Sequence, residues 1–265
     1  MPTNAATRAL VRDLERAAGR EHVLHHPEDL VGFEYDATIE RATPDAVVFP
    51  ENAEEVAAIV EVARRHDVPI VPRGSGTGLA GGALAVRGGV LCVMTRMNRI
   101  LEMDAANRIA VIEPGVINLA LQDEAAKHGL TYAPDPSSQR VCTIGGNIAT
   151  NSGGPHTLAH GSTVNHVLGV EVVLPDGRIT WLGGRQLDTP GPDLRGLFVG
   201  SEGTLGIVTK VCVRLIRIQP AVRTMLAIFK TVDAASAAVS DVIRQGVIPV
   251  AMEMLDHEII VAVEQ

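Results

Sequence analysis

Glycine-rich turns that follow short apolar runs are what most constrains the fold of this 265-residue chain. Residues 72–82 read Pro-Arg-Gly-Ser-Gly-Thr-Gly-Leu-Ala-Gly-Gly and directly follow an apolar run at residues 68–71. Glycine has no Cβ, so successive backbone amides in such a turn can face one point and contact a ligand closely. Converging amides suit a phosphate or pyrophosphate. An ordinary β-turn is the alternative interpretation of one isolated glycine cluster.

Two further glycine-rich segments favour a ligand that extends across several turns. Residues 143–154 place Thr, Asn and Ser side chains among four glycines, and Pro-Asp-Pro-Ser-Ser precedes them at 134–138. Residues 197–207 contain Glu202 between two glycines. That carboxylate can accept hydrogen bonds from ligand hydroxyls, or it can simply cap its own turn. Three separated turns indicate a ligand longer than a mononucleotide.

Other nucleotide and metal motifs fit this chain poorly. Residues 76–81 match GxGxxG, but a strand is expected after them, whereas a Rossmann site requires a helix there. The chain contains no GxxxxGK[ST] motif, which excludes a P-loop NTPase. His156 and His160 have helical spacing but lie in a segment rich in glycine and proline. We therefore expect structural roles for them and no metal site.

Charge and composition exclude several classes of partner. A formal net charge of −8 and an aromatic content of 3% argue against a nucleic-acid surface. No apolar stretch reaches the roughly 18 residues that a membrane-spanning helix needs, and the N-terminus lacks the pattern of a signal peptide. Three cysteines without a CxxC pair fit free thiols in a reducing compartment. We expect a cytoplasmic protein without a transmembrane segment.

Hydrophobic periodicity predicts a mixture of helices and strands, with a β-α-β unit before the first glycine-rich loop. Residues 134–161 are expected to form one long loop, and long loops are commonly functional. The expected helices are 7–18, one that starts at Asn52, and 117–128; the expected strands are 45–50, 68–71, 89–94, 108–113, 167–174, 178–182 and 206–218.

The pattern changes near Pro220. Two predicted strands, at 225–229 and 247–254, flank a predicted helix at 232–245, and another helical pattern starts at Asp256. We interpret this part as the opening of a second, incomplete domain whose uncovered apolar residues predict self-association. The expected division is residues 1–40 as an N-terminal helix and connector, 41–220 as the main domain, and 221–265 as the second domain.

Together these segments resemble the FAD-binding domain of the vanillyl-alcohol oxidase (PCMH) flavoprotein superfamily, in the branch with glycolate oxidase FAD subunits and D-lactate dehydrogenases. The resemblance covers nearly the whole chain in order. It implies an α+β fold: a two-lobed PCMH-type FAD-binding domain, followed by the truncated start of a ferredoxin-like cap domain. The segments that carry it are residues 71–79, 134–138, 143–154, 161–177 and 198–209.

The resemblance also implies where FAD would be held. The first loop would bind the pyrophosphate through backbone amides, the second segment would line the isoalloxazine and ribityl chain, and the third would hold the far portion of the cofactor. The first loop offers no histidine for covalent attachment, so we predict non-covalent FAD. The expected contacts are Pro72, Arg73, Gly74, Ser75, Gly76, Thr77, Gly78, Leu79, Pro136, Ser137, Thr143, Gly145, Gly146, Asn147, Ala149, Thr150, Gly153, Glu202, Gly203, Gly206 and Ile207.

The implied reaction is oxidation of a 2-hydroxy acid such as glycolate or D-lactate, in which the C2 hydride passes to flavin N5 while an enzyme base takes the hydroxyl proton. Electrons would continue to an iron–sulfur or other acceptor subunit, through which any membrane association would arise. In this branch the base comes largely from the cap and C-terminal segment, so we assign no catalytic residue. The alternatives are a flavin-binding electron-transfer or assembly subunit without its own substrate site, and a Rossmann NAD enzyme.

Overall fold

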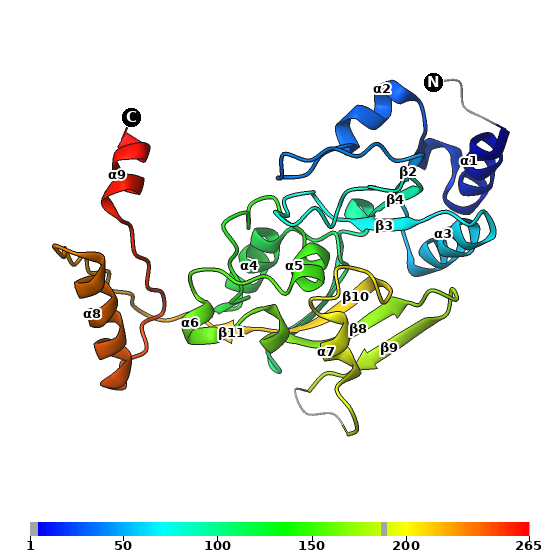
Figure 1. Ribbon diagram of the computed structural model, residues 1–265. Coiled ribbons are helices and arrows are strands. Elements are labelled where there is room, and N and C mark those ends of the chain that lie inside the picture. The colour runs from blue at the N-terminus through cyan, green and yellow to red at the C-terminus, as the bar shows by residue number, and fades with distance from the viewer. Residues whose placement is uncertain (1–4, 187–189, 265) are drawn as a thin grey trace.

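The computed structural model describes residues 5–186 and 190–264. They form a mixed α+β body built on two β-sheets, with two C-terminal helices lying apart from it (Figure 1). The expected α+β fold class is therefore confirmed.

The first sheet forms the centre of the N-terminal lobe of the body. Its strands run in the order β1 (Val23–Leu24), β2 (Ala46–Val48), β4 (Val90–Val93), β3 (Ile70–Arg73), with β2, β4 and β3 parallel. The predicted β-α-β unit is present as β2, α3 (Ala53–Arg65) and β3, although β4 lies between the two strands. The Asn52 side chain caps α3 by accepting a hydrogen bond from the Glu55 amide at 2.8 Å.

The second sheet is antiparallel and forms the other lobe. Its strand order is β5 (Ile100–Asp104), β6 (Ile109–Ile112), β10 (Ile207–Arg214), β8 (Val167–Val173), β9 (Ile179–Gly183). The predicted hairpin at 167–182 is β8 and β9. The two lobes share a core, because Val173 and Ile207 of this sheet pack in one cluster with Leu14, Ile59 and Val90 of the first lobe.

Short elements connect the lobes and complete the second core. Its helices α4 (Asn118–Ala126) and α5 (Ile144–Thr150) bury Leu121, Ile144 and Ile148. The remaining elements are α1 (Ala5–Ala18), α2 (Pro27–Leu30), α6 (Thr157–His160), α7 (Leu194–Phe198), β7 (Leu130–Thr131), β11 (Ile216–Arg217) and the 3-10 turns Arg20–His22, Val31–Phe33, Met94–Arg96 and Thr163–Asn165.

Two expectations for the body were wrong. Residues 134–161 are not one loop, because they contain α5 and α6. Glycines in α5 disfavour a helix by propensity, but burial of its two isoleucines and the cap that Thr143 provides outweigh that preference. The predicted strand at 206–218 is divided into β10 and β11, which belong to different sheets.

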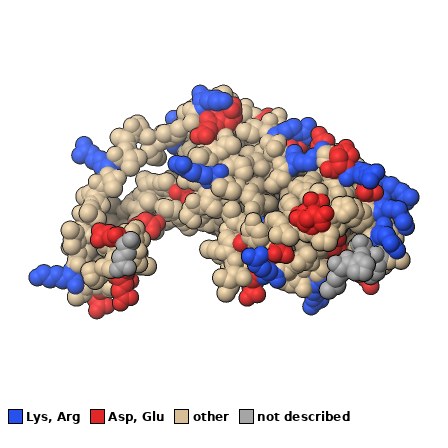
Figure 2. All heavy atoms as spheres, turned by 90° about the horizontal axis from the view of Figure 1, so that it is seen from above, with Lys and Arg blue, Asp and Glu red and all other residues tan. Residues whose placement is uncertain are grey.

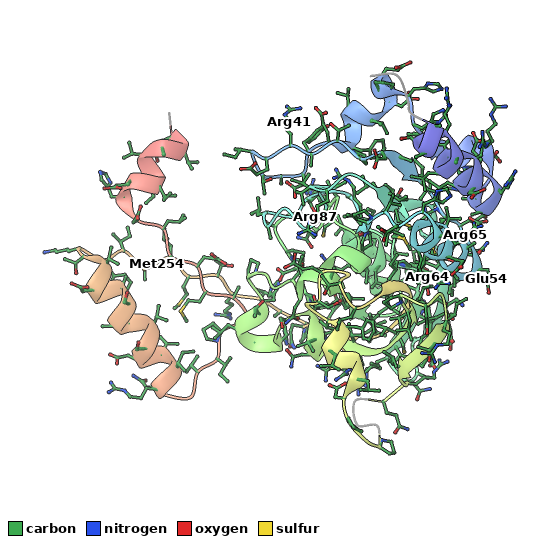
Figure 3. All side chains as sticks on the ribbon, turned by 45° about the vertical axis from the view of Figure 1, so that its right-hand side comes forward. Arg41, Glu54, Arg64, Arg65, Arg87 and Met254 are labelled. Carbon is green, nitrogen blue, oxygen red and sulfur yellow. The ribbon has the colours of Figure 1, made fainter. Side chains whose placement is uncertain are left out.

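The C-terminal arm, residues 219–264, also differs from expectation. It contains α8 (Val232–Arg244) and α9 (His257–Glu264), but no strand forms at 225–229 or 247–254. A strand needs a hydrogen-bonded neighbour, and no described residue pairs with these segments. The arm stands away from the body (Figures 1 and 2), and Met254 lies on it, apart from the body (Figure 3).

Candidate functional site

The three glycine-rich segments, which are far apart in the sequence, line a single cavity between the two lobes. The first follows the end of β3, the second contains the whole of α5, and the third is the turn before β10. Figure 1 shows α5 between the two sheets, and residues of α5 line the cavity.

Close contact between these segments depends on glycine at two positions. A Cβ at Gly74 would overlap the Thr143 hydroxyl, and a Cβ at Gly203 would overlap the ring of Pro72. Gly203 also has φ of 77°, a conformation that favours glycine. These glycines bring the chain segments together, whereas an added Cβ at Gly78 meets nothing within 4 Å.

The first loop presents backbone donors. Among the residues that the structure describes, the amides of residues 75–79 donate to no protein acceptor. The loop wraps around the guanidinium of Arg73, because a Cβ at Gly76 would overlap that group. Gly76 has φ of 72°, which lets the chain turn there. A row of unused amides over a cation is suited to an anionic group.

Two backbone carbonyls hold the Arg73 side chain in place. Its side chain is buried, with Nη2 donating to the Tyr35 carbonyl at 2.7 Å and Nη1 to the Ala83 carbonyl at 3.2 Å. Burial lowers the pKa of Arg73, while the nearby Asp36 carboxylate opposes that change. An arginine still carries its charge at neutral pH, so a fixed positive charge lies against the loop that carries the free amides. A pyrophosphate fits this donor set.

The second wall differs, because its backbone amides are already used. At the start of α5, the Ile144 amide donates to Val116 O at 2.8 Å, and the Gly145 amide donates to Pro114 O at 2.7 Å. The Gly146 amide donates to Thr143 Oγ1 at 3.2 Å. This wall can therefore contact a ligand mainly through side chains, among them Asn147, Thr150 and Ser152.

Glu202 lines the cavity, and its carboxylate lies against the end of the first loop. A Cβ at Gly82 would lie 2.5 Å from its Oε2. Among the described residues its carboxylate oxygens accept no hydrogen bond, so it does not cap its own turn. Its own backbone amide instead anchors the turn by donating to Ala149 O at 2.8 Å. A free carboxylate here can accept hydrogen bonds from ligand hydroxyls.

Most of the expected contact residues line this cavity. The exceptions are Leu79, which is 80% exposed, Pro136, Ser137 and Gly153. Ser138 lines the cavity in place of its neighbour Ser137. Gly153 packs elsewhere, since a Cβ there would lie 2.7 Å from Thr157 Oγ1.

Several lining residues were not anticipated. Pro114 belongs to a Pro-Gly pair after a predicted strand, and this pair predicts a turn at that position. Met94, Phe198 and Val208 are apolar residues at the ends of elements, and nothing in their sequence context separates them from the core. The lining residues outside the expected contacts are Ala80, Gly82, Ala83, Met94, Pro114, Ser138, Cys142, Ser152, Phe198, Ser201 and Val208, of which Ser152 had been noted from the sequence as a polar side chain of the second segment.

The histidines lie outside the cavity lining. His156 pairs through Nδ1 with Asp135 at 2.7 Å, and its ring lies 6.4 Å from that of His160 on α6, which had not been expected to be helical. Within the described ranges, no group of three His, Cys, Asp or Glu side chains is placed to hold a metal ion.

The fold and the cavity define a binding domain for an extended, phosphate-containing cofactor. A family model described as "FAD binding domain" matches residues 44–183, and one described as "FAD linked oxidases, C-terminal domain" matches residues 218–265. The chain thus belongs to the FAD-linked oxidases and carries a PCMH-type FAD-binding domain, which confirms the resemblance found from the sequence.

Individual relatives agree with this assignment. The chain is 46% identical over 265 residues to the glycolate oxidase subunit GlcD of Escherichia coli (strain K12), covering 100% of this chain and 53% of that protein. It is 36% identical over 226 residues to a D-lactate dehydrogenase of Anaerostipes hadrus, covering 85% and 47%. The chain spans about half the length of these curated relatives.

A solved structure supports the fold. An alkyldihydroxyacetonephosphate synthase superposes with a TM-score of 0.78 at 25% identity, over 92% of this chain and 47% of that one. In the part of the chain that the structure describes, every helix is too short or too polar to cross a bilayer.

Proposed function

We propose that this chain is the FAD-binding part of an oxidoreductase that acts on a 2-hydroxy acid such as glycolate or D-lactate. The observation that carries the proposal is the row of free amides at 75–79 wrapped around the buried charge of Arg73. These groups would hold the pyrophosphate. Asn147 and Thr150 would contact the flavin or its ribityl chain, and Glu202 would accept cofactor hydroxyls.

The names of the relatives supply the substrate class. One is a glycolate oxidase subunit and another a D-lactate dehydrogenase. Bound FAD would supply, at N5, an acceptor for the hydride from C2 of such an acid. The acid, which also loses its hydroxyl proton, would be released as the 2-keto acid. The residues of this chain bind and orient the cofactor, and the electrons would continue to an iron–sulfur or other acceptor subunit.

The domain division is part of the same proposal. Residues 41–220 would form the FAD-binding domain, residues 1–40 its N-terminal helix and connector, and residues 221–265 the start of the substrate-binding cap. The match of the C-terminal family model to residues 218–265 supports a boundary near residue 220.

Attachment of the cofactor is proposed to be non-covalent, because no histidine is found in the described lining of the cavity. The test is an absorption spectrum of the purified chain, repeated on the supernatant after acid precipitation. We expect a flavin spectrum that moves into the supernatant as FAD. Flavin that stays with the precipitate would contradict non-covalent binding, and a colourless protein that takes up no added FAD would contradict FAD binding itself.

A flavin-binding electron-transfer or assembly subunit is the second candidate. In the described cavity lining, the only titratable side chains are Arg73, Cys142 and Glu202, so no histidine or lysine base is present. The chain alone is expected to be inactive, because the resemblance places the base in the cap. Anaerobic mixing of glycolate or D-lactate with the FAD-loaded protein extended by a complete cap domain therefore separates the candidates. Loss of the oxidised-flavin absorption supports a dehydrogenase. Loss that requires a separate partner chain supports the second candidate.

A further inference from the structure

A chain of amide side chains connects the cavity wall to residues behind it. Asn147 lines the cavity and is 2% exposed, and Asn118, the first residue of α4, is completely buried. Asn118 Nδ2 donates to Asn147 Oδ1 and to Pro134 O, both at 3.0 Å. Gln122 Nε2 donates to Asn118 Oδ1 at 2.7 Å and to Gln139 Oε1 at 3.1 Å.

Hydrogen-bond chemistry fixes the direction of each amide in this chain. A proline carbonyl can only accept, so the group of Asn118 that faces Pro134 must be its NH2. The same NH2 also faces Asn147, so Asn147 must present its oxygen to Asn118. The Asn147 NH2 is then turned to the opposite side, toward other cavity-lining groups.

The Asn147 donors meet only weak acceptors there. Asn147 Nδ2 lies 3.4 Å from Ser152 Oγ and 3.4 Å from Cys142 Sγ, and both partners line the cavity. The contact with the serine is longer than the usual range of about 2.7–3.2 Å for N–H···O bonds, and sulfur is a weak acceptor. A ligand atom with a stronger lone pair can therefore replace either contact.

We infer that Asn118 is a positioning residue for the cofactor: it locks Asn147 so that an N–H donor faces the cavity, and the atom bound there must be an acceptor. This inference rests on the proposed function, since FAD is the ligand for which the acceptor is sought. A flavin carries ring carbonyl and ring nitrogen acceptors, and its ribityl chain carries hydroxyl oxygens. Asn118 makes no contact with the cavity and acts only through Asn147.

A first test needs no ligand. In the FAD-free chain, nuclear Overhauser contacts of the Asn147 side-chain NH2 protons report which way the amide points. We expect contacts with the β protons of Ser152 and Cys142. NH2 contacts that are stronger with the Asn118 side chain than with Ser152 would overturn the inference, whether or not the chain binds FAD.

A second test measures FAD affinity in a double-mutant cycle with Asn118→Leu, Asn147→Leu and the double variant. We expect Asn118→Leu to weaken FAD binding about tenfold, the effect of one lost hydrogen bond, and to have no further effect when Asn147 is already leucine. If Asn118→Leu weakens FAD binding equally with asparagine and with leucine at position 147, Asn118 has only a structural role. If it does not weaken FAD binding at all, Asn118 does not position Asn147 for the cofactor.

Controls separate these outcomes from general destabilisation. Asn52→Ala removes a helix cap outside the cavity lining and should lower thermal stability without changing FAD affinity. Gln122→Leu removes only the outer support of Asn118 and provides a milder variant if Asn118→Leu does not fold; it should weaken FAD binding less. A wild-type chain that binds no FAD would contradict the proposed function, and the ligand-free contacts would still decide the inference.

Discussion

Among single residues, His166 shows how burial sets a pH response. Its side chain is completely buried, its Nε2 lies 2.9 Å from the His160 carbonyl, and its Nδ1 has no partner among the described residues. Burial is the largest cause that lowers the pKa of His166, and the charge of Arg214 adds to it, while the hydrogen bond to His160 opposes it. The folded state therefore holds this imidazole neutral.

The sign of the stability change follows from that shift. Below the ordinary histidine pKa of 6.5, the unfolded chain binds a proton that the folded chain takes up only at lower pH, so stability falls as the pH decreases. We expect His166→Gln to lose less unfolding free energy than the wild type between about pH 7 and about pH 5. Urea titrations at both pH values measure the difference, and equal losses would contradict it.

The cavity residues show what could be read from the sequence at this scale. Glycines next to apolar runs indicated which segments would line the cavity, so most lining positions in the first and second segments were predicted. The sequence could not separate Gly74 and Gly203, which allow two segments to touch, from Gly78, which adjoins open space. That distinction depends on distances between segments about 70 to 130 residues apart, and local pattern carries no such information.

At the scale of elements, the third glycine-rich segment, which is the turn before β10, packs against the end of β3. Gly203 has a positive φ and lies against Pro72. We expect Gly203→Ala to destabilise the FAD-free chain by more than about 1 kcal/mol, because alanine is strained at positive φ and its Cβ would overlap the proline. Chemical denaturation measures this loss.

The first loop supplies the matched control for that variant. Gly78 does not have positive φ, and a Cβ there meets no atom within 4 Å. Gly78→Ala should therefore change the stability of the FAD-free chain by less than about 1 kcal/mol. Similar losses in both variants would mean that contact with Pro72 does not hold the turn.

Elements also mark the limits of prediction from pattern. Strands and helices with a clear apolar period, such as α1 and β8, were predicted close to their observed bounds. Helix α5 was missed because Gly145 and Gly146 lower its propensity, and only burial of the neighbouring isoleucines reveals it. The predicted strands in the C-terminal arm have the right pattern but no neighbour to pair with.

At the scale of the whole molecule, the arm exposes an unusual amount of apolar surface. Leu226 is 90% exposed and Ile228 is 89% exposed, and α8 and α9 bury none of their described residues. Figure 2 shows open space between much of the arm and the body. Large apolar patches on a soluble surface favour association.

We therefore expect this 28.0 kDa chain to self-associate. Light scattering after size exclusion should give a mass that rises with concentration, and Leu226→Lys with Ile228→Lys should return it toward the monomer. Val86→Lys is the control, because Val86 is 75% exposed but belongs to the body. A monomer at all concentrations would contradict the expectation.

The cavity is assembled from residues as distant as Pro72 and Val208, and this has a consequence for biosynthesis. No complete cofactor site exists until both lobes have emerged from the ribosome and packed together. FAD would then bind the native state alone and stabilise it by mass action, by about 2.7 kcal/mol at a hundredfold excess over Kd. Cellular protein abundance responds to changes of that size. The supply of riboflavin would thus help to set how much of this protein survives proteolysis.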